Sequence, residues 1–83
     1  MADLNLEIIS PNGVVFKGNC HLATIPSVEG EMGIMSGHEA VVVSLKAGEI
    51  VTYDEKQNIL KKFEVISGFA EVRESNGLLV LVD

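Results

Sequence analysis

The sequence has few of the residues that cross-link, carry positive charge or span membranes. Its single cysteine, Cys20, excludes an internal disulfide. Lysine and arginine total 6 against 12 aspartates and glutamates, and this shortage of positive charge argues against nucleic acid and anionic lipid as partners. No apolar run approaches the ~20 residues of a membrane span, and the first residues show no secretory-signal pattern. We therefore expect a cytosol-facing protein without direct membrane insertion.

What the sequence does contain is enough apolar material for one core. Its 83 residues bound a single domain, 1–83, near the lower size at which one core is sufficient. Apolar residues make up 47% of the chain although the net charge is −6. A domain of this size leaves much of its surface outside the core, so this content predicts apolar surface reserved for a partner.

Strand signals dominate, because apolar positions alternate with a period of two. Leu4, Leu6 and Ile8 share one face of a first strand. Further strands are expected at 14–16, 18–25, 41–43, 49–53, 59–66, 69–74 and 78–82, with Pro26 ending the second of these. A short helix between His38 and Ala47 remains an alternative to the strand at 41–43.

Turn residues separate these runs at short intervals. Ser10-Pro11-Asn12-Gly13 combines a fixed φ at proline with a glycine that accepts the left-handed region, and Asn76-Gly77 predicts a hairpin. Short strands and frequent turns together predict an all-β fold, a flattened antiparallel β-sandwich of about eight to ten strands.

The most distinctive stretch runs from Glu29 to His38 and holds three glycines, two glutamates and a histidine. We interpret it as a loop that presents backbone and charge to a partner. Between Lys17 and Lys46 the chain has no lysine or arginine. A partner with basic residues is therefore expected to be attracted to this acidic region.

Catalytic and metal-binding patterns are lacking. Cys20 and His21 are adjacent, so in a strand they point to opposite faces and cannot bind one metal together; Cys20 is expected to be buried. Nothing near Glu29 and Glu31 in the sequence would separate the pKa values of the two carboxyl groups for acid-base catalysis. We expect no catalytic, cofactor or metal site and no small-molecule substrate.

Five segments resemble, in order and spacing, the epsilon subunit of bacterial F-type ATP synthase, specifically its N-terminal β-sandwich domain. The resemblance covers about residues 6–83 and is carried by Leu6-Glu7-Ile8-Ile9-Ser10-Pro11, Phe16-Lys17-Gly18, Glu29-Gly30-Glu31-Met32-Gly33-Ile34 with Gly37-His38, Val65-Ile66-Ser67-Gly68-Phe69-Ala70-Glu71-Val72, and Leu79-Val80-Leu81-Val82-Asp83. The two C-terminal helices that follow in many relatives, and the inhibition and nucleotide binding they carry, are not expected of these residues.

The resemblance implies a non-catalytic rotor subunit that links the gamma subunit to the membrane c-ring and so couples proton flow to ATP synthesis. Its place would be the cytoplasmic face of the bacterial inner membrane. The implied c-ring contacts are Glu29, Glu31, Gly33, Ser36, Gly37 and His38, and the implied gamma contacts are Ser10, His38, Val41 and Val43.

An alternative is a lipoyl or biotinyl carrier domain, which is also a small acidic β-sandwich with its modified lysine at a hairpin tip. Lys56 lies in a predicted turn beside an acid pair, Asp54 and Glu55. The carrier signature around the lysine is missing, so the epsilon-type reading is favoured.

Overall fold

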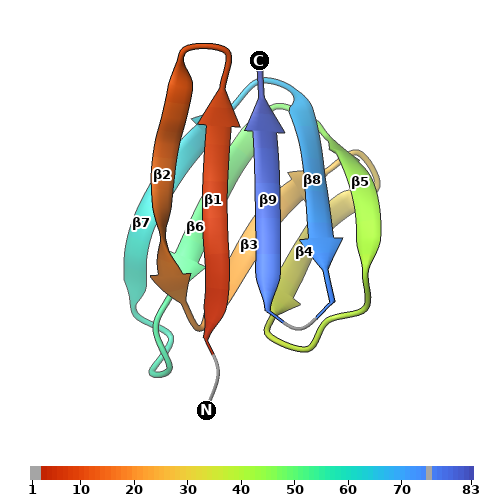
Figure 1. The fold of residues 1–83 in the computed structure, drawn as a ribbon. Coiled ribbons are helices and arrows are strands. Elements are labelled where there is room, and N and C mark those ends of the chain that lie inside the picture. Colours follow the sequence, from red (N-terminus) through yellow and green to blue (C-terminus); the bar gives the residue numbers. More distant parts are fainter. Residues whose placement is uncertain (1–2, 75) are drawn as a thin grey trace.

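The structure is a computed structural model that describes residues 3–74 and 76–83, and these residues form nine strands and no helix (Figure 1). The described residues therefore include no helix long and apolar enough to cross a membrane. The expected all-β class is confirmed. In chain order the strands are β1 (Leu4–Ser10), β2 (Gly13–Cys20), β3 (Leu22–Ser27), β4 (Gly30–Met35), β5 (Val41–Leu45), β6 (Gly48–Tyr53), β7 (Ile59–Val65), β8 (Gly68–Arg73) and β9 (Gly77–Val82).

The strands form two facing layers. In Figure 1, β2, β1, β9, β8 and β5 make the front layer, and β7, β6, β3 and β4 make the layer behind it. Pairing continues from one layer to the other in the order β2-β1-β9-β8-β5-β3-β6-β7, with β4 paired to β3. The β1–β9 ladder is parallel, whereas the other ladders of the described residues are antiparallel. The expected antiparallel sandwich is thus confirmed with one parallel exception.

The core lies between the layers and is formed by alternate residues of the strands. Leu4, Leu6 and Ile8 of β1 are buried, as their spacing predicts. They pack with buried residues from the other strands: Cys20, Ala23, Ile25, Ile34, Leu45, Ile50, Val65, Ala70, Val72, Leu78 and Val80. Every strand of the described chain therefore either contributes to this core or pairs with one that does.

The two flanks of the sandwich are closed differently. On the flank where β2 faces β7, the rings of Phe16 and Phe63 meet with centroids 5.0 Å apart. On the other flank, β5 joins β3 through the register pair Ser27 and Leu45. The backbone N–H of Val28 donates to the carbonyl of Ser44 beside that pair, at 3.0 Å. Below this junction β4 and β5 diverge.

Three predicted strand boundaries are wrong. The strand expected at 18–25 is divided at His21, which separates β2 from β3. The break expected at Lys17 does not occur, and β2 runs through it to Cys20. Gly18 pairs with Leu6 of β1, and the Phe16 ring occupies the space that a side chain at Gly18 would need. Pro26 does not end β3. The carbonyl of Pro26 accepts a hydrogen bond from the N–H of Lys46 at 2.8 Å, on the side of β3 that faces away from β4. The N–H that proline lacks would point to the same side, so the β3–β4 ladder loses no hydrogen bond.

The turn predictions fare better. Ser10 Oγ accepts from the N–H of Asn12 at 3.2 Å, and Gly13 has φ +125°, as the sequence of this turn requires. β8 and β9 are antiparallel neighbours, as expected, but Gly77 already belongs to β9 opposite Arg73. The connection between them includes Ser75, which lies outside the described residues. The helix considered between His38 and Ala47 is not formed, because Val41–Leu45 is β5.

Candidate functional site

The acidic segment predicted as one loop is mostly a strand. Gly30–Met35 form β4, paired with β3 in a hairpin whose turn contains Val28 and Glu29. The loop expectation failed because Ile34 is fully buried and Met32 packs against the core. This alternation outweighs the glycines, of which Gly30 (φ +127°) starts the strand. The period-two apolar spacing of Met32 and Ile34 was the signal that could have identified the strand.

The six residues expected to contact the c-ring are therefore not gathered at one tip. Glu29 precedes β4 and the Ser36-Gly37-His38 turn follows it, so the six-residue strand separates them by roughly 20 Å. Glu31 and Gly33 lie between and are exposed. The turn is held by the His38 N–H, which donates to the Met35 carbonyl at 3.1 Å, and Gly37 there has φ +89°. The structure arranges these residues along the whole length of one strand.

The residues expected to contact gamma are also distributed. Ser10 lies where β1 ends, whereas His38 lies in the connection from β4 to β5 at the opposite end of the molecule (Figure 1). Val41 and Val43 are half-buried and pack against the core, facing inward from β5. Between them Val42 points outward with 65% of its surface exposed.

An apolar feature that the sequence reading did not identify crosses the outer face of the front layer. Val14, Ile9, Leu81 and Phe69 are register neighbours on β2, β1, β9 and β8, and we call them the outer apolar row. Val14, Leu81 and Phe69 are 60%, 46% and 56% exposed. Such a contiguous exposed apolar band is typical of an interaction surface. The signal was present in β9, whose GLLVLV sequence is apolar on both faces.

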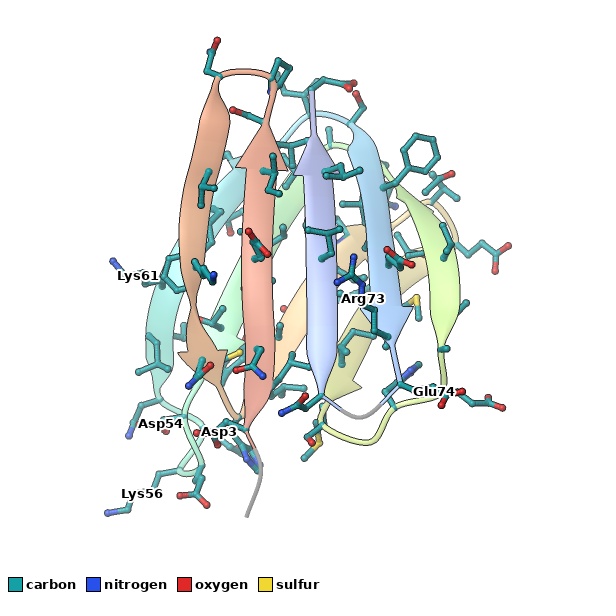
Figure 2. All side chains as sticks on the ribbon, viewed as in Figure 1. Asp3, Asp54, Lys56, Lys61, Arg73 and Glu74 are labelled. Atoms are coloured by element: carbon teal, nitrogen blue, oxygen red, sulfur yellow. The ribbon has the colours of Figure 1, made fainter. Side chains whose placement is uncertain are left out.

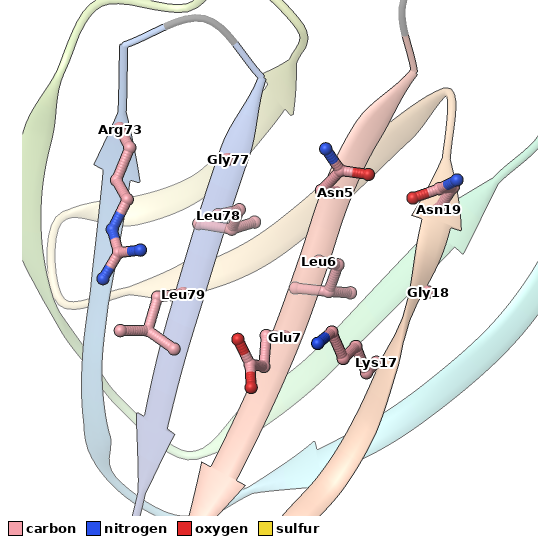
Figure 3. A pocket seen from close by; sticks show the side chains of 10 residues that line it. All are labelled: Asn5, Leu6, Glu7, Lys17, Gly18, Asn19, Arg73, Gly77, Leu78 and Leu79. Carbon is pink, nitrogen blue, oxygen red and sulfur yellow. The ribbon is translucent and has the colours of Figure 1, made fainter.

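A hollow of about 380 Å³ lies beside the outer apolar row on the same face (Figure 3). Gly77 lies between its register partners Arg73 and Asn5 and has no side chain that would fill the hollow. Glu7 and Lys17 occupy opposite register positions on β1 and β2 along its other side. Arg73 Nη2 lies 3.4 Å from Glu71 Oε1 and is mostly exposed. This part of the face offers charged and amide groups next to the apolar band, a combination suited to docking a partner. The other residues that line it are Leu6, Gly18, Asn19, Leu78 and Leu79.

Cys20 lines a hollow that Asp3, His21, Asp54 and Glu55 also line. Cys20 is a free, buried thiol, as expected, and burial, followed by the negative charge of Asp3, raises its pKa to about 11. A thiol with such a pKa is a poor nucleophile at neutral pH. Within residues 3–74 and 76–83, no three His, Cys, Asp or Glu side chains are grouped so that they could hold a metal ion.

Lys56 does lie in the turn that its sequence predicts. It is exposed in the β6–β7 hairpin (Figure 2). Asp54 organises this turn, because its Oδ1 accepts from the N–H groups of Lys56 and Asn58, each at 2.9 Å. The hydrogen bond from the backbone N–H of Asn58 is the main cause that lowers the pKa of the Asp54 carboxyl group. These local hydrogen bonds to the Asp54 side chain account for the conformation of the turn.

Comparison with known proteins gives one family. Residues 3–83 match the family model described as the ATP synthase delta/epsilon chain, β-sandwich domain. The ATP synthase epsilon chain of Campylobacter lari is 38% identical over 76 residues, which are 90% of this chain and 58% of that protein. The epsilon chain of Afipia carboxidovorans is 37% identical over 84 residues, 100% of this chain and 59% of its relative. The chain thus spans somewhat less than two thirds of the length of these relatives.

Solved structures share the fold. A chain in the mitochondrial ATP synthase structure of Euglena gracilis, which comprises OSCP, F1 and the c-ring, superposes with a TM-score of 0.87 at 24% identity. The match covers 99% of this chain and 51% of that one. A chain in the central stalk and c-ring structure from Tetrahymena thermophila gives 0.74 at 17% identity, covering 98% and 63%. The carrier-domain alternative is not favoured by these matches.

Proposed function

Since the chain belongs to the family of the ATP synthase delta/epsilon chain β-sandwich domain, we propose that it is a non-catalytic subunit of the central stalk of an F-type ATP synthase. In this role it links the gamma subunit to the c-ring and couples proton flow to ATP synthesis, at the cytoplasmic face of a bacterial inner membrane. The observation that carries the proposal is the family match over residues 3–83, supported by relatives that are called ATP synthase epsilon chains.

The c-ring contact is proposed along the β3–β4 hairpin. Its exposed residues Glu29 and Glu31 are acidic, and Gly33 presents bare backbone beside them. Ser36, Gly37 and His38 extend the contact to the far end of β4. Because these residues span roughly 20 Å, the proposed contact is a long edge that can engage more than one c subunit.

The gamma contact is proposed on the front layer. Ser10 directly follows Ile9 of the outer apolar row, so both belong to one end of that face. We place gamma over the outer apolar row, where Phe69 and Leu81 supply area that becomes buried on binding. His38, Val41 and Val43 remain proposed contacts at the margin of β5.

Mechanical coupling requires a stiff connection. Each charge that crosses the membrane releases about 2.3 kcal/mol per 100 mV, and this work must pass between ring and stalk without slippage. A two-layer sandwich whose strands are hydrogen-bonded in a continuous order from β2 to β7 deforms little under load. The fold therefore suits a passive rotor part.

The c-ring proposal is tested by charge reversal in the reconstituted ATP synthase. Glu31→Lys is expected to weaken ATP-driven proton pumping and the retention of this subunit on the membrane sector. Its melting temperature should stay within a few degrees, because an exposed charge contributes little to folding. Glu64→Lys, on the exposed side of β7, is the matched control and should leave pumping unchanged. Equal loss in both variants would contradict the proposed contact.

The gamma proposal is tested in the same way with an apolar pair. Phe69→Asp introduces a charge into the outer apolar row and should reduce binding to purified gamma subunit. Ile59→Asp changes a residue of similar exposure, 53% against 56%, on β7, and should bind normally. If the two variants bind gamma equally well, the outer apolar row is not the gamma-facing surface.

A further inference from the structure

The flank between β4 and β5 exposes two strand edges. Among the strands of the described residues, β4 pairs with β3 alone. β5 pairs with β8 along its length but with β3 only at Leu45. The second edges of Gly30–Met35 and Val41–Val43 therefore have no ladder partner within residues 3–74 and 76–83. Unpaired edges of this kind are templates for an additional strand.

The other two edge strands of the sandwich carry lysines and have irregular ladders, whereas these two do not. β2 carries Lys17 and its ladder with β1 is irregular at Ile8/Ile9. β7 carries Lys61 and Lys62, and its ladder with β6 shifts register. Lysines and bulges are the usual means by which proteins prevent unwanted strand addition. β4 and β5 contain neither lysine nor proline, and β5 has no charged residue at all. This difference indicates edges that another strand covers.

A groove of about 640 Å³ separates the two edges. It is lined by Ser27–Met32 on one side and Val41–Ser44 on the other. Met32, Val41 and Val43 are half-buried and pack against the core, and so give the groove an apolar floor. The space suits an extended segment with small or branched apolar side chains.

The charged residues that line the groove are all acidic. Glu29 and Glu31 are both exposed at its rim, and the segments that line it contain no lysine or arginine. An extended segment alternates its side chains between two faces. A suitable partner strand therefore directs apolar residues to the floor and basic residues to the rim.

We propose that the groove between β4 and β5 accepts an extended segment of a partner polypeptide, which pairs its main chain with the free edge of β4. The segment alternates aliphatic residues with lysine or arginine. This inference goes beyond the proposed stalk function, because it concerns strand addition and does not depend on the identity of the assembly. Its failure would leave the family assignment unchanged.

The test uses the 83-residue chain and a blocked heptapeptide in which lysine alternates with valine. On titration to millimolar peptide, the amide resonances of Gly30–Met32 and Val41–Ser44 are expected to shift most in the NMR spectrum of the protein. The amides that gain partners should exchange more slowly with solvent. A peptide of the same sequence, N-methylated at alternate amides, keeps its charge but cannot form the ladder and should bind at least about tenfold more weakly.

Two protein variants separate charge from strand pairing. Glu31→Lys is expected to weaken the binding of the unmodified peptide by up to about fivefold. Glu64→Lys on β7 should leave the affinity for this peptide unchanged. Equal binding of the N-methylated peptide would overturn the proposal, because attraction would then be purely electrostatic. It is also overturned if the shifts map to β2 or β7, if no shift occurs at millimolar peptide, or if sedimentation shows a dimer of the chain that occupies the groove itself.

Discussion

The clearest structural prediction concerns Gly68, the first residue of β8. Its φ is +155°, a backbone conformation that residues with side chains rarely adopt. A Cβ placed there would overlap the carbonyl oxygen of Leu81 and lie 3.0 Å from the Cα of Val82. Both obstacles are backbone atoms of β9, the strand that pairs with β8. Gly68→Ala therefore cannot be accommodated by rotation of a side chain and must displace one strand from the other.

The expected magnitude combines two costs. Backbone strain contributes about 1–3 kcal/mol, and forced expansion of a packed contact about 1–3 kcal/mol, so Gly68→Ala should destabilise by roughly 2–6 kcal/mol. A domain of this length has a total stability of about 4–12 kcal/mol. Since 1 kcal/mol corresponds to about 4–8 °C for such a domain, the melting temperature should fall by at least about 8 °C.

The assay is thermal and urea unfolding followed by circular dichroism, with Gly13→Ala as the control. Gly13 also has positive φ, +125°, but a Cβ there meets nothing within 4 Å. The control thus carries the strain alone and should be at least about 1 kcal/mol more stable than Gly68→Ala. Equal stability of the two variants would refute the argument that β9 backbone atoms make glycine necessary at Gly68.

Three further predictions concern stability. The raised pKa of Cys20, about 11 against an ordinary 9.0, means that the unfolded chain loses its thiol proton first. Stability should therefore fall between about pH 9 and 11 in urea titrations, and Cys20→Ala should remove that part of the fall. The hydrogen bond from the backbone N–H of Asn58 is the main cause that lowers the pKa of Asp54. The Asp54 carboxylate should therefore stabilise the fold at pH values above 3.8, and this stabilisation should be lost as the pH falls below 3.8. Asp54→Ala should have a lower melting temperature than the parent at pH 7 and the same melting temperature at pH 2. Phe63→Ala removes the ring that contacts Phe16. It should lower the free energy of unfolding, measured in urea, by about 2 kcal/mol, which is less than the loss expected for a fully buried ring.

Local alternation was sufficient to predict most strands. Leu4, Leu6 and Ile8 could be assigned to the core from spacing alone, because a strand places every second residue on one face. The β-branched run at Val41–Val43 was likewise recognised as a strand. What spacing could not provide was the strand order. The parallel pairing of β1 with β9 joins residues more than 70 positions apart, and nothing local to either strand specifies its partner.

The candidate site was predicted in composition but not in shape. The acidity around Glu29 and Glu31 was visible in the sequence, yet the glycines suggested a loop where β3 in fact provides a ladder for β4. Tertiary pairing outweighed local turn signals, and the expected single tip became a long edge. The outer apolar row was not predicted, because Phe69 and Leu81 become neighbours only once β8 pairs with β9.

The proposed stalk function is tested most directly by affinity purification of the tagged chain from membranes of its native host. If the chain is a rotor part, gamma and c subunits should be recovered with it in constant proportion, and Phe69→Asp should reduce the recovery of gamma. Recovery of a soluble multienzyme complex, or of neither subunit from membranes that contain intact ATP synthase, would contradict the assignment.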